Sequence, residues 1–475
     1  MRPTNRQRVR SALSVAILST ALAAAAQTPG PSLPANPVAA VPAALSFAEA
    51  LAAAQQYDPQ YRGAIHELES ARLGVPVARA SLLPAVTLSA ATSEVQGYRQ
   101  FPNSLDQDVR VRVEYTTPQA ALTLRMPILN QEASKRLAQT EAQVEGAEIV
   151  HRSRGLDLLD RVANAYLSVL LAEDGLALAR EQEQAERLRV RQAEQRMQRG
   201  EGTRIDVAQA QASVDQARVR VIEADDQLQS ARRQLKAFIG MPVSTLLRLA
   251  DAVNPAGGEP LDDLNEWLAL AMRHNPQVQA RVQSVVVARL AVDRNRAGHL
   301  PRLDLVASLS RNQNESISNL NQISTLRSVG VQLSVPIFNG GGISAGVQQA
   351  QADVDRAEAE LVAERERVAL DVQRFHQTVA GGTERLRAHE RSVQSNELAL
   401  AGLRRGVEAG VATLADVGDA QARLYSTRRD LLRARVELLM AMTKLRLSAG
   451  LPLAEIAQAL DRALTQPSPA PQPRS

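Results

Sequence analysis

The chain has 475 residues, of which 45% are hydrophobic and 22% charged, so its composition excludes a disordered chain and allows several elongated pieces or one large core. It contains no cysteine, which excludes disulfides, thiolate metal sites and a lipid-anchored N-terminal cysteine. The net charge is +4, but the first ten residues contribute four arginines and no acid, so the basic balance gives no sign of nucleic acid binding.

A secretory signal peptide is predicted at residues 1–26. An arginine-rich start precedes the apolar run Ala12–Ala26, which ends in Ala-x-Ala cleavage choices before Gln27. A membrane anchor is the alternative, although the run is short for a spanning helix, and no later apolar stretch is expected to span as a helix. Residues 27–45 are rich in proline and alanine and are expected to be loose.

Two repeats follow, at residues 46–242 and 263–452. Each is expected to open with a helix that a proline interrupts and a Leu-Pro pair ends, because proline does not fit a helix interior. Ser46 with Glu49, and Asp263 with Glu266, have the spacing of a capping box. The matching positions are Ser46 and Asp263, Pro59 and Pro276, and Pro84 and Pro301, each pair 217 positions apart (263 minus 46 for the first). Agreement at this many markers indicates an internal duplication.

A pair of strands is predicted after each Leu-Pro, within residues 84–127 and 301–336. Apolar residues alternate with polar or small ones, at about ten residues per membrane crossing, and polar stretches at 97–108 and 311–324 are expected to separate the two strands of each pair. The alternating apolar positions include Val86, Leu88, Leu122, Leu124, Met126, Leu303, Leu305, Leu309, Val329, Val331, Leu333 and Val335. Such strands fit lipid on one face and water on the other, although a soluble hairpin packed on a core shows the same alternation.

Long helices are predicted after each strand pair. Both pairs leave through Pro-Ile-x-Asn, and Asn130 and Asn339 are expected to cap the helices that follow. Proline is absent from residues 131–240 and 342–449, so the helices in these regions can be very long.

The second half of each helical region, Gly200–Gly240 and Gly410–Gly450, carries the apolar seam of a coiled coil. Large and small residues alternate at spacings of three and four, which lets a partner helix approach closely. The seams are Val207, Ala210, Val214, Ala217, Val221, Ala224, Leu228, Ala231, Leu235 and Phe238, and then Val417, Ala420, Leu424, Thr427, Leu431, Ala434, Leu438, Ala441 and Leu445. Residues 243–262 are expected to connect the repeats, and residues 453–475 to form a C-terminal segment with a disordered proline-rich tail.

The predicted fold class is mainly α with a small transmembrane β part. Each chain supplies four strands, which cannot close a barrel, and an open edge cannot face lipid because its unpaired backbone groups are costly there. The smallest closed membrane barrels have about eight strands. A membrane-spanning sheet therefore requires oligomerisation, and a trimer would give a barrel of twelve strands.

The same sequence motifs occur in the same order in both repeats. Through them the chain resembles the TolC family of outer membrane channel proteins over nearly its whole length. The shared features are the Asp-Pro and Asn-Pro pairs, the Leu-Pro pairs, the Pro-Ile-x-Asn exits and the Gly-x-x-Thr-x-x-Asp tips that lead into Ala-Gln-Ala. Gly340-Gly341-Gly342 after the second exit is also typical of the family. The segments YDPQYRGAIHELESARLGVPVARASLLP and RVANAYLSVLLAEDGLALA are most similar to the branch that serves type I secretion.

The resemblance implies a homotrimer in outer membrane lipid, whose β-barrel continues into an internally duplicated α-helical tunnel through the periplasm of a Gram-negative bacterium. The tunnel would dock onto a periplasmic adaptor (a membrane fusion protein) and an inner membrane transporter of ABC or RND type. The sequence shows no catalytic, cofactor, metal or nucleic acid motif, so the chain is interpreted as a passive exit duct and not an enzyme. Its predicted task is type I protein secretion. The alternatives are the outer duct of a multidrug or metal efflux pump and, from another class, a secreted coiled coil without a pore.

Acidic residues at the two tips are the candidate entrance of the tunnel. Asp416 and Asp419 lie three positions apart on a predicted helix, so their carboxylates face the same way, and three chains would place two acidic rings at a constriction that favours cations. By resemblance, acids at these positions line the periplasmic entrance, and Asp206 helps to hold it closed. The alternative is that these acids only stabilise helix N-termini.

Four further residues, Gly200, Thr203, Gly410 and Thr413, mark the tips and by resemblance meet the adaptor. Their alternative and compatible role is turn chemistry, with glycine at positive φ and threonine as a helix cap.

Two departures from the family pattern concern the entrance. Relatives with a well-defined lock carry tyrosine and arginine where this chain has Val407 and Ala412, so that polar latch is missing. Ile205 replaces a polar residue on the first tip, and Arg204 beside it is a candidate substitute.

Overall fold

The computed structural model describes residues 44–102, 104–243, 245–249, 263–316 and 319–465. The predicted signal peptide, the loose segment up to residue 43, most of the connecting segment and the proline-rich tail lie outside the described residues. Leu45 belongs by composition to the loose segment, yet only 4% of it is exposed and it forms a bridge with Leu246.

A short helix and a longer one open each repeat, separated by the predicted proline break. They are α2 (Phe47–Tyr57) and α3 (Pro59–Ala80), and then α6 (Leu264–His274) and α7 (Pro276–Ala297). Ser46 and Glu49 form the predicted capping box. The second predicted box is wrong. The Asp263 side chain makes no cap hydrogen bond to α6, and its carboxylate instead accepts a bond from Asn265 Nδ2 at 3.0 Å.

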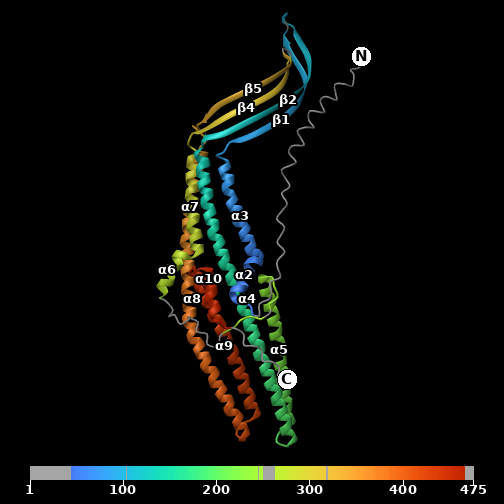
Figure 1. The fold of residues 1–475 in the computed structure, drawn as a ribbon, viewed down its shortest axis with the longest axis vertical. Coiled ribbons are helices and arrows are strands. Elements are labelled where there is room, and N and C mark those ends of the chain that lie inside the picture. The colour runs from blue at the N-terminus through green and yellow to red at the C-terminus, as the bar shows by residue number, and fades with distance from the viewer. Residues whose placement is uncertain (1–43, 103, 244, 250–262, 317–318, 466–475) are drawn as a thin grey trace, which may run out of the picture. The chain divides into compact units, whose positions relative to one another are not determined.

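The four long strands form one antiparallel sheet in the order β1-β2-β4-β5, so β1 and β5 are its edges (Figure 1). They are β1 (Ala85–Pro102), β2 (Asp108–Leu129), β4 (Arg302–Ser316) and β5 (Asn319–Ser334). All four are longer than predicted, because most of the polar stretches at 97–108 and 311–324 are strand and not loop. Backbone pairing does not require apolar side chains, so the ladder continues where the apolar alternation ends.

The helices that follow the two strand pairs start differently. Asn130 caps α4 (Gln131–Gln198) as predicted, accepting a hydrogen bond from Ala133 N at 3.0 Å. Asn339 does not cap α8 (Gly342–Glu408) with its side chain. That helix begins after Gly341, which has a φ of 79°, and only the Asn339 carbonyl takes part, accepting from Gly342 N at 2.9 Å. The extra glycines separate the asparagine side chain from the helix end.

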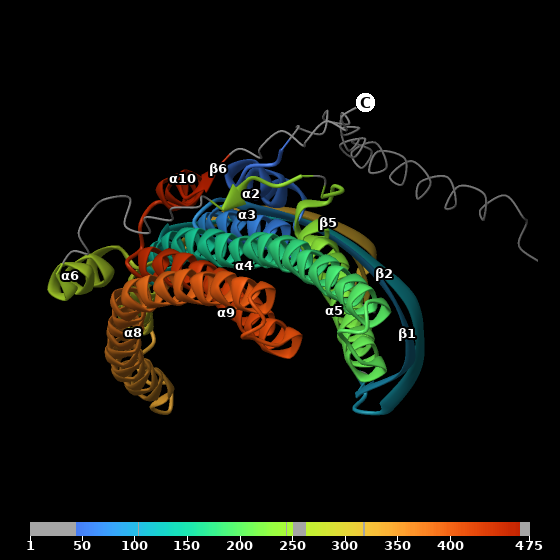
Figure 2. The same ribbon diagram turned by 90° about the horizontal axis from the view of Figure 1, so that it is seen from below.

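The long helices pair as the heptad seams predict. α4 continues for 68 residues and α8 for 67, and each packs along the helix that follows it, α5 (Arg204–Ile239) and α9 (Leu414–Ser448) respectively. α9 also packs against α4, so the helices α8, α9, α4 and α5 follow one another in a single wall (Figure 2). The sheet adjoins the start of α4, and the two helical turns lie at the opposite end (Figure 1).

The main hydrophobic core surrounds the middle of α4. Tyr166 is fully buried there, where its hydroxyl donates to the Leu45 carbonyl at 2.8 Å and accepts from Leu247 N at 3.2 Å. Burial raises the pKa of this phenol. Among the described helices, only α4 has a stretch long and apolar enough to cross a membrane, and half of that stretch is buried in the protein. Core packing accounts for it, although no such stretch is expected from the sequence.

The C-terminal helix α10 (Leu453–Arg462) packs against the first helix. The Asp461 carboxylate accepts hydrogen bonds from Phe47 N at 2.8 Å and Ala48 N at 3.1 Å, so it satisfies free amides at the start of α2. Two short strands, β3 (Arg248–Leu249) and β6 (Leu464–Thr465), also pair and tie the end of the second repeat to the end of the first. Neither feature is predicted above.

The duplicated markers meet at two equivalent junctions. Gly240 ends α5 at a φ of 73° against the Tyr57 ring, and Gly450 follows α9 at a φ of 75° against the backbone of His274. A Cβ atom on Gly450 would lie 2.4 Å from the His274 carbonyl carbon. The Gly-x-Pro and the Asp-Pro or Asn-Pro markers therefore recur together because each glycine makes room for the end of α2 or α6.

Candidate functional site

The two helical turns have the same construction. Gly200 and Gly410 adopt φ values of 77° and 75°, which lets the backbone reverse in a tight turn. Thr203 and Thr413 then cap α5 and α9. The turn chemistry expected for these four residues is present, and all four are exposed. Their contact with an adaptor stays a prediction.

Asp206 and Asp416 complete a capping box at each tip. Thr413 donates to Asp416 Oδ2 from its backbone N at 2.9 Å and from Oγ1 at 2.6 Å, and Asp416 N donates back to Thr413 Oγ1 at 3.1 Å. Asp206 and Thr203 repeat this arrangement. The bond from the Thr413 hydroxyl, and then that from its backbone, lower the pKa of the Asp416 carboxyl, and the Thr203 backbone bond is the main cause of a lowered pKa at Asp206. Helix capping alone therefore accounts for an aspartate at position 206 and at position 416.

Asp419 lies one turn beyond Asp416 on the same exposed side of α9. Val417 and Ala420 next to them are buried in the seam, so both carboxylates lie away from the packed face, as their spacing predicts. Acidic rings require further copies of the chain. The entrance role of these two residues and of Asp206 therefore stays a prediction.

An apolar seam holds the second tip, where the polar latch is missing. Val407 packs against a cluster of buried residues that includes Leu400 and Val417. Arg204 is exposed and has no hydrogen-bond or ion-pair partner within the described part of the chain, and 67% of Ile205 beside it is exposed. Arg204 therefore does not replace the latch in a single copy of the chain.

A polar cluster inside the seam of α4 is not predicted above. Gln182, Glu186 and Arg189 follow one another at spacings of four and three, and the exposed fractions of the first two are 6% and 4%. Arg189 pairs with Glu186 at 3.2 Å and donates to Ser213 Oγ of α5 at 3.2 Å. Its guanidinium also lies against Gly418 of α9, where a Cβ atom would displace it. One arginine thus contacts three helices.

Burial governs the chemistry of Glu186. Desolvation raises the pKa of its carboxyl, and Arg189 and Arg220 counteract this in part. Arg220 of α5 also donates to Gln182 Oε1 at 3.2 Å and lies 5.7 Å from the centre of the Tyr425 ring of α9. The cluster therefore joins the two helix pairs through a single buried acid and two arginines.

A groove of about 770 Å³ opens between the two helix pairs near their tips. Its lining comes from α4 and its turn on one side and from α8 and α9 on the other, and includes Arg196, Arg199, Glu201, Arg404 and Glu408. Among the described residues no group of three His, Cys, Asp or Glu side chains is placed to hold a metal ion. Because its two walls come from different helix pairs, the groove separates the two tips, which also lie apart in Figure 1.

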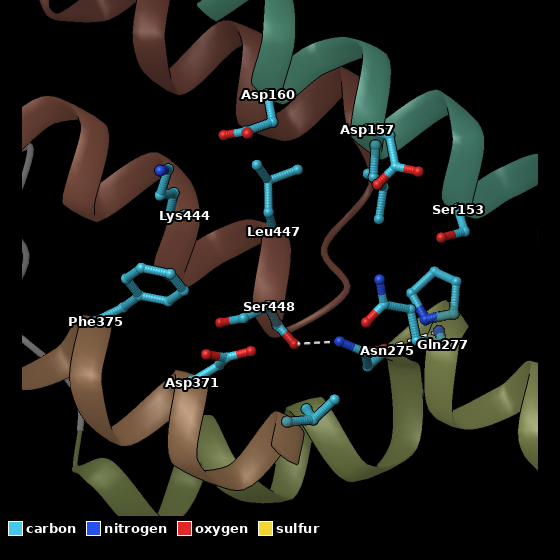
Figure 3. Close-up of a pocket in the computed structure, with 13 residues that line it drawn as sticks. Ser153, Asp157, Asp160, Asn275, Gln277, Asp371, Phe375, Lys444, Leu447 and Ser448 are labelled. Atoms are coloured by element: carbon cyan, nitrogen blue, oxygen red, sulfur yellow. Dashed lines mark hydrogen bonds between the residues drawn. The ribbon is translucent and has the colours of Figure 1, made fainter. Parts of the chain in front are cut away.

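A second cavity, of about 250 Å³, is lined by residues of α4, α7, α8 and α9 (Figure 3). Asp157, Asp160 and Asp371 line it, and burial raises the pKa of the Asp157 carboxyl. Asn275 in its wall is buried and donates to the Ser448 carbonyl at 2.8 Å. This cavity belongs to the junction between α7 and α9, and its acids alone define no ligand.

The half of the sheet next to the helices has one apolar and one polar face. Residues paired across the strands share a face, so that Leu122 lies between Leu88 and Leu309. The apolar face carries Val86, Leu88, Leu122, Leu124, Met126, Leu305, Leu309, Val329, Val331 and Leu333. The polar face carries Thr87, Ser89, Thr123, Arg125, Asp304, Ser308, Ser328 and Gln332, with Val306 and Leu326 as apolar exceptions. Several of the apolar side chains are more than 60% exposed in the single chain. A band of this size and pattern fits contact with lipid.

An ion pair joins the two repeats on the polar face. Asp304 of β4 is buried, and Arg125 of β2 donates to its Oδ2 from Nε at 3.0 Å and from Nη2 at 2.5 Å. Arg302 approaches the same oxygen at 3.5 Å. These contacts hold β2 and β4 together where the sheet meets the helices.

A sheet with an exposed apolar face suited to lipid, joined to two pairs of long helices, defines an outer membrane channel protein with a helical extension. The family described as Outer membrane efflux protein matches residues 50–241 and 267–451, which are most of the two repeats. The chain belongs to this family, and the resemblance to the TolC family is confirmed.

Individual relatives agree with this assignment. The chain is 31% identical over 414 residues to the alkaline protease secretion protein AprF of Pseudomonas aeruginosa, with 86% of this chain and 85% of the relative covered. It is also 31% identical over 414 residues to the proteases secretion protein PrtF of Dickeya chrysanthemi, with 86% and 88% covered. Among solved structures, the outer-membrane channel OprN has a TM-score of 0.72 at 20% identity, with 86% of this chain and 90% of that chain covered.

These findings establish the general role of the chain. It is an outer membrane channel that reaches into the periplasm and not an enzyme. The predicted fold class, a helical tunnel with a small β part, is confirmed. Channels of this family act in tripartite export systems together with an adaptor and an inner membrane transporter.

Proposed function

We propose that the chain forms, as a homotrimer, the outer membrane exit duct of a type I protein secretion system. The observation that carries the proposal is its similarity, over 86% of its length, to two proteins named for the secretion of proteases. The two unpaired edges of the sheet support the trimer, because three four-stranded sheets can close a barrel and leave no edge in lipid.

The partners follow from this task. A periplasmic adaptor contacts the tips at Gly200, Thr203, Gly410 and Thr413, and a transporter of the ABC type supplies the energy. The exposure of all four residues supports this contact. Asp416 and Asp419, with Asp206 on the other tip, form the acidic entrance of the tunnel.

Recording ion currents through planar lipid bilayers tests the pore and the entrance together. Wild-type protein purified in detergent is expected to give discrete cation-selective channels. Asp416→Ala/Asp419→Ala is expected to lower the ratio of cation to anion permeability several-fold, because it removes two rings of negative charge. Glu384→Ala on α8 is the matched control, since it removes an exposed acid far from the tips.

The outcomes separate the parts of the proposal. Channels whose selectivity is the same in the double variant and the wild type would keep the pore and refute the acidic entrance. Protein that sediments as a soluble rod and never inserts would leave the secreted coiled coil as the better interpretation.

A second candidate function is the outer duct of an efflux pump, which the description of the matched family favours. Expression in a Gram-negative strain without its own outer channel distinguishes the two. Restored protease secretion by a co-expressed type I system supports the main proposal, whereas restored drug resistance without secretion would overturn it.

A further inference from the structure

The first hairpin of the sheet projects beyond the second. β1 and β2 pair without interruption from Ala85 with Arg125 to Pro102 with Asp108. β2 pairs with β4 only from Gln119 toward the helices. The residues of β1 and β2 beyond this point therefore form a free two-stranded arm, visible as the curved end of the sheet in Figure 1.

The two faces of the sheet exchange their polarity along this arm. The face that carries Leu88 and Leu122 near the helices continues along the arm as Thr92, Glu94, Gln96, Tyr98, Gln100, Arg110, Arg112, Glu114 and Thr116. Some of these side chains form polar contacts with one another. Arg112 forms an ion pair with Glu114 at 3.3 Å, and the Arg110 guanidinium lies 4.4 Å from the centre of the Tyr98 ring. No register shift occurs between β1 and β2, so the same physical face changes from apolar to charged.

The change of polarity marks the outer limit of the lipid contact. Across the sheet, the row in which Ala90 pairs with Ala120 continues to Arg311 of β4. Arg327 of β5 lies on the same face, opposite Leu309. Charged residues thus begin on this face at the rows of Leu88 and Ala90 in the second hairpin, and at Glu94, two rows further out, in the first. Such a change is expected where a strand leaves hydrocarbon for the headgroups and water.

The opposite face of the arm is apolar, although it continues the polar face of the membrane part. Six of its ten positions carry large apolar or aromatic side chains, and the other four are Ser93, Gly97, Arg99 and Thr117. The six are Val95, Phe101, Val109, Val111, Val113 and Tyr115, which we call the mouth face, and each is half-buried while its neighbours along the strand are exposed. If the apolar band faces lipid, the mouth face turns toward the axis of the pore and not toward the membrane.

We propose that the mouth faces of neighbouring copies of this chain pack against one another and close the outer mouth of the pore. This inference rests on the proposed assembly of the barrel from several copies. β1 is an edge strand, so each arm continues the surface at which one copy joins the next. The shorter second hairpin leaves no strand of the same copy to cover the arm, and water at a pore mouth does not favour six apolar side chains.

Single cysteines test the proposal, because the natural chain contains none. Val111→Cys places a thiol on the mouth face, and Arg112→Cys is the matched control on the opposite face of the same strand. In the detergent-purified oligomer, we expect a charged maleimide to label Val111→Cys at least about tenfold more slowly than Arg112→Cys, since labelling requires the arms to open. After the oligomer is dissociated into single chains, the two rates should agree within about twofold.

Three results would overturn the proposal. Equal rates in the intact oligomer would mean that the mouth face is open to water. A difference that persists in single chains would mean that the arm buries the residue by itself. Protection in membranes but not in the detergent-purified oligomer would identify lipid as the occupant.

A second pair of variants repeats the test in case Val111→Cys or Arg112→Cys fails to assemble. Val113→Cys and Glu114→Cys have the same relation to the two faces and should give the same difference in rate. Bilayer recordings of the wild type separate this inference from the proposed function. A wild type that conducts but has equal labelling rates refutes only the closed mouth, whereas a wild type that neither assembles nor conducts refutes the pore.

Discussion

At the scale of single residues, Gly450 is fixed by two independent constraints. Its φ of 75° disfavours any residue with a Cβ atom, and that atom would collide with the backbone of His274, which cannot rotate away. Gly418 differs, because its missing Cβ faces only the end of the flexible Arg189 side chain. A glycine-to-alanine substitution therefore costs more stability at Gly450, which faces backbone, than at Gly418, which faces a movable side chain.

We expect Gly450→Ala to destabilise the fold by about 3 kcal/mol, because backbone strain and a backbone clash combine. Gly418→Ala should cost less than about 1 kcal/mol, since Arg189 can move. Thermal unfolding followed by far-ultraviolet circular dichroism measures both. Gly63→Ala is the control, because nothing lies within 4 Å of the new methyl group on α3 and alanine should stabilise a helix by up to about 1 kcal/mol. Equal melting temperatures for the three variants would refute the argument.

A second prediction concerns Asp416 and the Thr413 hydroxyl. Because hydrogen bonds lower the pKa of this carboxyl, its charge should persist to a lower pH than that of an ordinary aspartate and disappear only as the pH falls through the lowered value. Thr413→Ala removes the main cause of the shift, so the pH at which cation selectivity is half lost should move upward. Reversal potentials measured in bilayers at a series of pH values report this midpoint. Thr203→Ala at the other tip is the comparison, and a midpoint that moves downward in Thr413→Ala would contradict the assignment.

Local sequence rules identified some of these residues and not others. The box at Ser46 and Glu49 was predictable because both partners act within one turn. The box at Asp263 has the same spacing and fails, since Asn265 competes for the carboxylate. The contact between Gly450 and His274 joins positions far apart in the chain. Only the presence of both markers in each repeat hinted at it.

At the scale of helices and strands, the polar cluster of α4 is the main unpredicted feature. Gln182, Glu186 and Arg189 occupy the seam spacing between Ala179 and Ala193, both of which are buried. A charged residue at a seam position was the available signal, but the predicted seams began only at residue 207. The strand ends were missed for the opposite reason, because polar composition suggested loops where the backbone ladder continues.

We expect Arg189→Met to destabilise the helix pairing at neutral pH by about 3 kcal/mol, because it leaves the buried Glu186 carboxylate without its nearest cation. Glu186→Gln in the same chain should restore most of the loss, which a double-mutant cycle of melting temperatures would show. Burial raises the pKa of Glu186, so the penalty in Arg189→Met is present above that raised value and fades as the pH falls through it. A penalty that grows on acidification would contradict this explanation.

At the scale of the whole molecule, the exposed apolar band predicts how substitutions affect assembly. Val331→Arg on β5 should destabilise the membrane-inserted form by about 2–4 kcal/mol, since it places a cation in hydrocarbon. Gln332→Arg is the matched control on the polar face of the same strand and should have little effect. The yield of the assembled oligomer in outer membrane fractions measures the difference. Equal yields for the two variants would mean that the face assigned to lipid is wrong.

The general architecture was largely predictable, because it follows from features that repeat along the sequence. Proline spacing, heptads and alternation gave the helices, the strands and the need for several copies. The closure of the core by α10, with its contacts between the two ends of the chain, was not predictable. It depends on single side chains such as Asp461, whose partners lie 414 and 413 positions away.

This last contact sets an order of events during maturation. A polypeptide is delivered to the periplasm with its N-terminus first, so Phe47 and Ala48 arrive long before Asp461. Until the end of the chain is released, two amides at the start of α2 lack their acceptor and that helix end is free to fray. A chain that is cut short never acquires the acceptor and keeps an open segment of the kind that proteases attack. Only a chain that reaches Asp461 can therefore complete the hydrogen bonding at the start of its first helix.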